Sequence, residues 1–212
     1  MHITLVAATG KIGTHIAQTA LARGHSLKAI TRNDKPLPAE LQAATAQKVD
    51  VFDTRAFAAA LHNTDVLASA YGPSLDNVDE LPTLTRALIE AARAAGVKRV
   101  VVVGGAGSLE VAPGAQLVDS PNFPAAYKAL ALAHRDAFNY LRSVSDIDWT
   151  FYAPAALIQP GDKLGGYRTG SVSLISNAAG QSLIHYPDYA EAFVAELESP
   201  QYPQTIATVA YA

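Results

Sequence analysis

The sequence predicts an α/β fold built on a doubly wound parallel sheet with helices on both faces. Short apolar runs alternate along the chain with amphipathic stretches, which is the pattern of repeated βα units joined by right-handed crossovers. The run Val100–Val103 contains only β-branched residues, as is typical of a strand buried on both faces. The length of 212 residues suits one domain over residues 1–212, with residues 154–212 expected to add a small lobe on the substrate side.

In the first half of the chain, strands are predicted where apolar runs are bounded by turn residues, and helices where apolar residues recur every three or four positions. Gly24 and Gly96 end two of the helices, and Asp53 or Thr54 begins a short one. The expected strands are 2–7, 26–31, 45–51 and 65–70, and the expected helices are 12–23, 56–61 and 79–95.

The second half continues the alternation with strands at 100–103, 149–153, 171–176 and 206–210, and with helices at about 125–142 and 188–198. The connection from Gly104 to Pro124 is long for a compact domain. Its apolar and proline content favours a packed lid over a mobile loop.

The composition excludes several classes of function. Half of the residues are hydrophobic and 17% are charged, which excludes a disordered chain. The net charge is −3 and no basic cluster occurs, so no nucleic-acid partner is expected. The chain has no cysteine, and its 6 histidines lack the spacing of metal ligands, so no metal is expected. No apolar run is long enough to span a membrane, and a cytoplasmic protein without a membrane partner is predicted.

The turn after the first strand carries the strongest functional signal. A helix N-terminus presents free N–H groups and a partial positive charge, which suits a pyrophosphate. Gly10 would let the backbone approach that anion, and Gly13 would let helix and strand pack closely, as in a Rossmann-like dinucleotide site. Ala7 stands where the first glycine of such turns is usual. The alternative is a tight turn without a ligand. The predicted cofactor contacts are Ala7, Thr9, Gly10, Lys11, Ile12 and Gly13.

Arg32 directly follows the second strand, where an acidic residue would favour NAD. A guanidinium there suits the 2′-phosphate of NADPH, with NADH as the other possibility, although an exposed surface arginine is the plain alternative. Asp50 is predicted to accept the adenine amino group and Val51 to pack on the adenine ring; otherwise Asp50 is only a loop aspartate.

Three more strands end in small or aromatic residues. Ligands of such sheets bind beyond the carboxyl ends of the strands, so these residues are predicted to border the cofactor. They are Ala70, Tyr71, Gly72, Gly104, Gly105 and Pro154.

Several segments together resemble the atypical short-chain dehydrogenase/reductases, in particular the NAD(P)H-binding, NmrA-like group that includes NAD(P)H-flavin reductases. The segments are 7–13, 49–53, 104–111, 148–150 with 154–155, and 189–190. The resemblance implies hydride transfer from NADPH to a conjugated acceptor such as a quinone or a flavin, with FMN or FAD as a substrate. It also leaves open a non-catalytic NAD(P)-sensing protein, a homodimer, and an epimerase that holds NAD.

One feature departs from that family. Its catalytic Tyr-x-x-x-Lys motif is absent, because Pro124 occupies the tyrosine position that would accompany Lys128. Flavin or quinone reduction does not require a tyrosine acid, since solvent can supply the proton. Lys128 is therefore predicted to supply positive charge near the acceptor, with Tyr127 beside it, or else to be a surface lysine. His134 is interpreted as structural.

Overall fold

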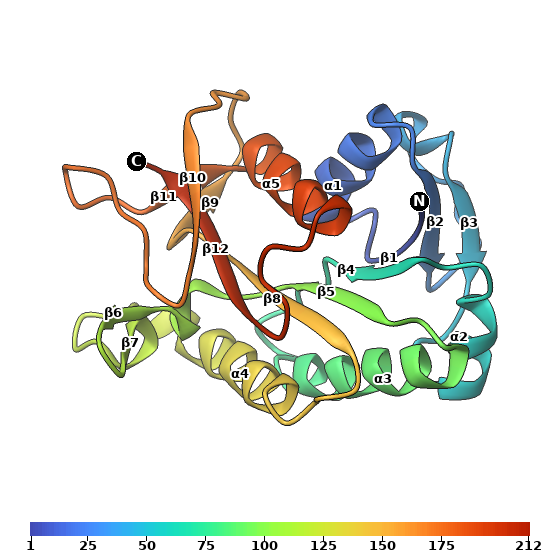
Figure 1. Cartoon of the computed structure of the whole chain (residues 1–212), viewed down its shortest axis with the longest axis horizontal. Coiled ribbons are helices and arrows are strands. Elements are labelled where there is room, and N and C mark those ends of the chain that lie inside the picture. Colours follow the sequence, from blue (N-terminus) through green and yellow to red (C-terminus); the bar gives the residue numbers. More distant parts are fainter.

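The computed structural model describes residues 1–212, which form an eight-stranded sheet in the order β10-β12-β8-β5-β4-β1-β2-β3 (Figure 1). Seven strands are parallel, and β10 runs antiparallel to β12 at one edge. The doubly wound parallel sheet is thus confirmed. The strands are β1 (His2–Val6), β2 (Ser26–Thr31), β3 (Thr45–Lys48), β4 (Val66–Ser69), β5 (Arg99–Val103), β8 (Asp148–Pro154), β10 (Tyr167–Ser171) and β12 (Thr205–Tyr211).

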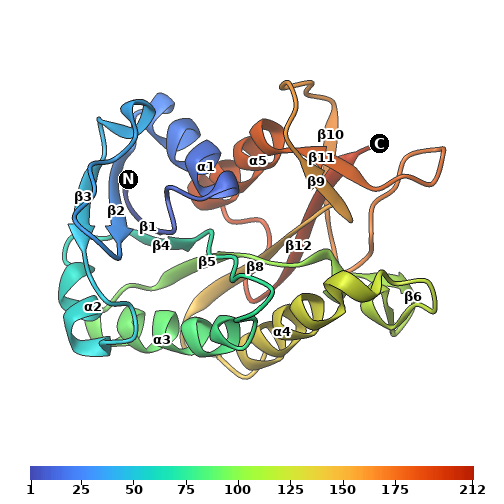
Figure 2. The same ribbon diagram turned by 180° about the vertical axis from the view of Figure 1, so that it is seen from behind.

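Five α-helices cover the two faces of the sheet (Figures 1 and 2). Two of them, α1 (Lys11–Ala22) and α5 (Tyr186–Glu198), lie side by side above the sheet. Three lie below it: α2 (Thr54–Ala60), α3 (Glu80–Ala95) and α4 (Ala125–Leu141). Every helix predicted from the sequence is present, with ends that differ by a few residues.

The core consists of two apolar layers that share the central strands. Val101 and Val103 of β5 pack into the layer with α1 and α5, whereas Val100 and Val102 pack into the layer with α2, α3 and α4. Successive side chains of a strand point to opposite faces, so a continuous β-branched run fills both layers. This confirms the prediction that the strand is buried on both faces.

The segment between β5 and α4 is packed, as predicted. It contains a turn of 3-10 helix at Ala106–Ser108, a hairpin of β6 (Glu110–Ala112) and β7 (Ala115–Gln116), and a second 3-10 turn at Leu117–Asp119. Leu109 and Val118 are buried and hold this segment to the domain.

The strand predicted at 171–176 is wrong. The structure places β10 at Tyr167–Ser171, and Val172 leaves the strand with a φ of 55°. The residues that follow turn back so that the N–H of Leu174 donates to the carbonyl of Glu110.

A second small sheet, β9 (Leu157–Gln159) with β11 (Leu183–His185), was not predicted. Of residues 154–212, β10 and β12 join the main sheet and α5 packs on α1. The β9–β11 pair lies outside the main sheet, but Ile184 of β11 is buried in the apolar layer with α1 and α5.

A buried ion pair joins the end of the chain to its middle. Arg99 of β5 donates to Glu196 of α5 at 2.7 Å and to Asp148 of β8 at 3.1 Å. Glu196 also accepts bonds from Thr150 and from the N–H groups of Gln201 and Tyr202. The carboxylate is therefore fully partnered, which offsets the cost of burying it.

No helix of the structure combines the length and the apolar character that crossing a membrane requires.

Candidate functional site

The carboxyl ends of the parallel strands form the edge of the sheet where the predicted residues meet. In the centre of the sheet β1 pairs with β2 on one side and with β4 on the other. The chain leaves β1 toward β2 and β3, but leaves β4 toward β5 and β8, so the connections diverge between β1 and β4. Such a switch point is where open α/β sheets bind their ligands. We call this the carboxyl edge.

The turn between β1 and α1 has the geometry of a phosphate cradle. Gly10 precedes α1, no side chain caps the helix, and no acidic residue occupies its first turn. A Cβ on Gly13 would lie 2.1 Å from the carbonyl oxygen of Ala7, so only glycine lets α1 approach the turn this closely. The uncapped N–H groups and the helix dipole therefore face the edge without a protein anion. This arrangement fits the pyrophosphate of a dinucleotide.

Ala7 adopts the backbone conformation that the missing glycine would favour. Its φ is 59°, in the left-handed region, and its carbonyl accepts a 3.0 Å bond from the N–H of Gly10. Alanine tolerates this conformation at some cost, so the substitution preserves the shape of the turn.

Arg32 lies exposed after β2 and makes no ion pair. The nearest acidic residue in the sequence, Asp34, accepts instead from Lys48 at 2.6 Å. Tyr71, which follows β4, donates its hydroxyl to Glu80 at the start of α3. Burial, followed by this bond, raises the pKa of Tyr71 to about 12, and the charge of Arg32 acts in the opposite direction. Arg32 is thus a cation without a protein partner, within electrostatic reach of Tyr71.

Asp50 and Val51 follow β3, as predicted, but part of the Asp50 carboxylate is already engaged. Its Oδ1 accepts a 3.0 Å bond from the N–H of Phe52, while Asp53 caps α2 through the N–H of Ala56. Val51 is half-buried against the lower apolar layer. The second carboxylate oxygen of Asp50 accepts no hydrogen bond from the protein, and the predicted adenine contact stays a prediction.

Packing within the protein explains the two glycines after β5. A Cβ on Gly104 would lie 2.3 Å from the ring of Phe151, and one on Gly105 would lie 2.8 Å from the ring of His134. Gly72 differs, since a Cβ there meets nothing within 4 Å. Pro154 ends β8, paired with Val209. Gly104 and Gly105 are thus required by their neighbours whether or not a cofactor lies over them.

Tyr127 and Lys128 lie in the first turn of α4. Tyr127 is 58% exposed. The ammonium of Lys128 donates to the carbonyl of Val118 and lies 5.6 Å from the centre of the Phe123 ring. Neither side chain bonds to a residue predicted to contact the cofactor. Their catalytic roles stay a prediction, and Lys128 has a visible structural role in tying α4 to the segment before it.

His134, which the sequence indicates is structural, lies against the carboxyl edge. Its ring packs beside Gly105 and forms an edge-to-face contact with Phe151, with 6.1 Å between ring centres. It makes no hydrogen bond, and Nδ1 is buried without a partner. Burial lowers the pKa of His134 to about 4, so the imidazole is neutral at pH 7. No sequence motif marks this position, because only the fold brings it to Gly105.

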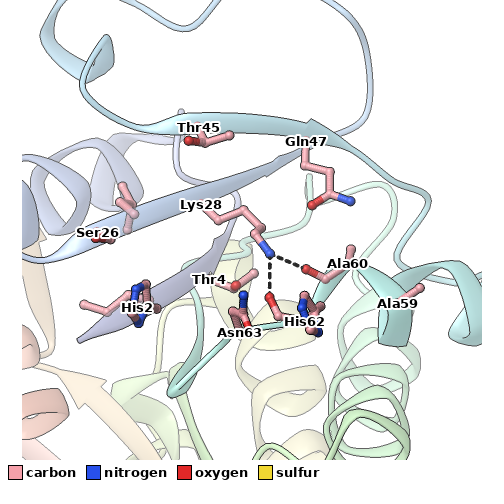
Figure 3. A pocket seen from close by; sticks show the side chains of 12 residues that line it. His2, Thr4, Ser26, Lys28, Thr45, Gln47, Ala59, Ala60, His62 and Asn63 are labelled. Atoms are coloured by element: carbon pink, nitrogen blue, oxygen red, sulfur yellow. Dashed lines mark hydrogen bonds between the residues drawn. The ribbon is translucent and has the colours of Figure 1, made fainter.

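A hollow of about 430 Å³ lies at the opposite, amino edge of the sheet (Figure 3). Its central cation is Lys28, which donates to the carbonyls of Ala60 at 2.6 Å and His62 at 3.0 Å. Thr4 is bonded to Thr64 at 2.7 Å, and His2 is paired with Asp65. The main polar groups of this hollow therefore already have partners within the protein.

The fold and the phosphate cradle together define a dinucleotide-binding protein, and comparison with known sequences agrees. A family model described as NAD(P)H-binding matches residues 7–200. The chain therefore belongs to the NAD(P)H-binding family. It is 37% identical to the uncharacterized protein YwnB of Bacillus subtilis over 99% of this chain and 98% of that protein.

Solved structures with the same fold carry different names. A protein from Burkholderia pseudomallei, named as a candidate exported protein, is 51% identical over all of both chains, with a TM-score of 0.93. A candidate NADH-flavin reductase from Streptococcus pneumoniae is 31% identical over all of both chains, with a TM-score of 0.91. A candidate epimerase from Bacteroides thetaiotaomicron is 34% identical, covering 99% of this chain and 96% of that one, also with a TM-score of 0.91.

Proposed function

We propose that this protein is an NADPH-dependent oxidoreductase that reduces a flat conjugated acceptor, a flavin or a quinone. The observation that carries the proposal is the carboxyl edge itself, where an uncapped helix N-terminus and the unpaired Arg32 offer two anion sites. The candidate NADH-flavin reductase at 31% identity supports the choice of acceptor. Arg32 supports NADPH over NADH.

Different residues of the carboxyl edge would bind different parts of the cofactor. The N–H groups of Lys11, Ile12 and Gly13 would hold the pyrophosphate, and Arg32 would hold the 2′-phosphate. When bound, NADPH supplies a hydride from its nicotinamide ring. Tyr71, Gly105 and Pro154 end neighbouring strands and would border that ring.

The absence of a tyrosine acid limits the chemistry. Pro124 precedes α4 and the exposed Tyr127 is its third residue, so no tyrosine stands four residues before Lys128. A conjugated ring can accept hydride while solvent supplies the proton, whereas a simple ketone needs a proton donor at its oxygen. Lys128 would stabilise negative charge on the acceptor only if its ammonium left the Val118 carbonyl.

A second candidate is an NAD(P)-sensing protein without catalytic activity. The hydrogen bond from Lys128 to the Val118 carbonyl favours this second candidate, because the ammonium predicted to assist the acceptor is already bound within the protein. The two candidates share the binding site and differ in turnover.

NADPH oxidation with FMN, FAD and menadione as acceptors tests the proposal. We expect turnover with at least one acceptor, less than a tenfold loss in Tyr127→Phe, and a larger loss in Lys128→Ala. Cofactor binding measured by calorimetry should stay intact in both variants. Binding without turnover for the whole panel would favour the sensing protein. A loss of several hundredfold in Tyr127→Phe alone would indicate tyrosine-dependent proton transfer instead.

A further inference from the structure

The small sheet of β9 and β11 has one buried face and one outward face. Ile158 and Ile184 lie opposite each other in the two parallel strands, and both pack into the apolar layer with α1 and α5. Because successive side chains of a strand point to opposite faces, the residues on either side of these isoleucines point outward. They are Leu157, Gln159, Leu183 and His185.

The outward face is apolar at one end and polar at the other. Leu157 and Leu183 are neighbours across the two strands, and Leu157 is 52% exposed. At the polar end, Nδ1 of His185 donates to the carbonyl of Asp162 at 2.9 Å, whereas the side-chain amide of Gln159 has no hydrogen bond within the protein. The face therefore leaves apolar surface and one free amide for a ligand.

The chain places this face beside the expected nicotinamide. Leu157 follows Pro154, the last residue of β8, by three positions, and three residues of extended chain span at most about 10 Å. β11 contacts β12 and leads directly into α5, whose first residue, Tyr186, lies against His15 of α1 with 5.6 Å between ring centres (Figure 2). The β9–β11 pair thus adjoins both the ends of β8 and β12 and the helix that begins at the phosphate cradle. Its inward face is part of the core, so its outward face is the one that a ligand can contact.

We propose that the outward face of the β9–β11 pair is the acceptor-binding surface, with the flat ring of the acceptor resting on Leu157 and Leu183. This inference rests on the proposed function, because hydride transfer requires the acceptor to lie in contact with the nicotinamide at the end of β8. The leucines would bury the apolar face of a flavin or a quinone, and the amide of Gln159 suits the ring carbonyls that both acceptors carry. The two leucines would then determine specificity for the acceptor and not for the cofactor.

The test measures acceptor binding and turnover separately. FMN and menadione are each titrated into the protein loaded with NADP⁺, and steady-state kinetics with NADPH are recorded for the wild type, Leu157→Ala and Leu157→Met. We expect Leu157→Ala to weaken acceptor binding and to raise the acceptor KM about tenfold, with kcat within about twofold. Methionine is apolar and of similar volume, so it should restore both. NADPH affinity, measured by calorimetry, should not change in either variant.

Leu164→Ala is the matched control. Leu164 is 64% exposed in the same part of the chain, but it lies outside both strands, where its N–H donates to Asp188 of α5. Its truncation should leave acceptor binding unchanged.

The outcomes distinguish this inference from the proposed function. Unchanged acceptor binding in Leu157→Ala, an equal loss in Leu164→Ala, or a parallel loss of NADPH affinity would overturn the acceptor surface alone. Acceptor binding that depends on Leu157, in a wild type without turnover, would support the surface and refute the proposed function. A wild type that binds neither acceptor would refute both. If Leu157→Ala does not fold, Leu183→Ala repeats the measurement from the neighbouring strand.

Discussion

The two edges of the sheet show opposite ways of treating polar groups. At the amino edge Lys28, Thr4 and His2 surround a hollow of about 430 Å³, and each has a partner within the protein (Figure 3). At the carboxyl edge the first turn of α1 is uncapped and Arg32 has no ion pair. A hollow alone does not mark a binding site. Hydrogen-bond donors and charged groups that have no partner within the protein are the better indicator. Substitutions at the carboxyl edge should therefore affect ligand binding, and those at the amino edge should affect stability alone.

The largest effect is expected from Gly13→Ala. The new methyl group would lie 2.1 Å from the Ala7 carbonyl, so α1 must move away from the phosphate cradle. We expect NADPH affinity to fall roughly 100-fold and stability to fall by about 1–3 kcal/mol. Calorimetry and urea unfolding measure the two effects. The matched control is Gly170→Ala in β10, where the methyl group meets only the flexible end of Ile175 at 3.3 Å. Equal binding by both variants would place the cofactor elsewhere.

The next effect concerns pH. The folded-state pKa of His134 is about 4, below the ordinary value of 6.5, so the unfolded chain binds the extra proton first. Stability from this group is complete above pH 6.5 and is lost as the pH falls toward 4, by roughly 3 kcal/mol. Stability is measured by urea unfolding between about pH 4.5 and 7.5, a range chosen around the two pKa values. It should depend less on pH in His134→Phe than in the wild type. His62→Phe, at the amino edge, is the control; an identical slope in all three proteins would contradict the assignment.

Arg32→Ala should separate the two cofactors. Removing a charge-assisted bond to the 2′-phosphate costs about 1.5–3 kcal/mol, so NADPH should bind at least about tenfold more weakly. NADH should bind nearly as before. Arg55→Ala, which removes the same charge from an exposed position on α2, should alter neither affinity. Equal losses for NADPH and NADH would remove the argument for a phosphate contact.

Lys28→Met tests the amino edge. The lysine ammonium donates to carbonyls at and just beyond the C-terminal end of α2, so its loss should lower stability by about 1 kcal/mol. NADPH affinity should not change. Lys35→Met, an exposed lysine outside any salt bridge, serves as the control for charge. Weaker NADPH binding in Lys28→Met would show that the two edges are coupled.

The smallest effect is expected from Ala7→Gly. Glycine adopts a φ near 59° without strain, so stability should rise by up to about 1 kcal/mol with NADPH affinity retained. Ala8→Gly, at the next residue and without positive φ, should lower stability by about 0.5–1 kcal/mol. A loss of stability in both variants would mean that the Ala7 methyl group contributes more through packing than it costs in strain.

The sequence was sufficient for the regular parts of the fold. Runs such as Val100–Val103 and the helix that ends at Gly96 have strong periodicity and clear boundaries, and the structure has both. The prediction failed at 171–176, because Val172 and Leu174 alternate like strand residues while the backbone turns at Val172. Strands of two or three residues, such as β7 and β9, carry no periodic signal at all.

The residues of the site could be predicted from the sequence where they lie within one turn. They could not be predicted where the fold brings distant parts of the chain together. Gly10 and Gly13 lie within one βα unit, so their spacing alone indicated the cradle. His134 and Gly105 are far apart in the sequence and meet only because α4 packs beneath the end of β5. In the same way, nothing in the sequence indicated that Lys128 would bond to Val118.

The buried pair of Arg99 and Glu196 has a consequence for the order of folding. The two residues are 97 positions apart, and Glu196 lies on the last helix. During synthesis Arg99 can pair first with Asp148 of β8, but its buried partner Glu196 is available only after α5 has emerged, and a buried charge that lacks a partner is strongly unfavourable. A chain truncated before α5 is therefore expected to hold the middle of the sheet less stably than the full chain does.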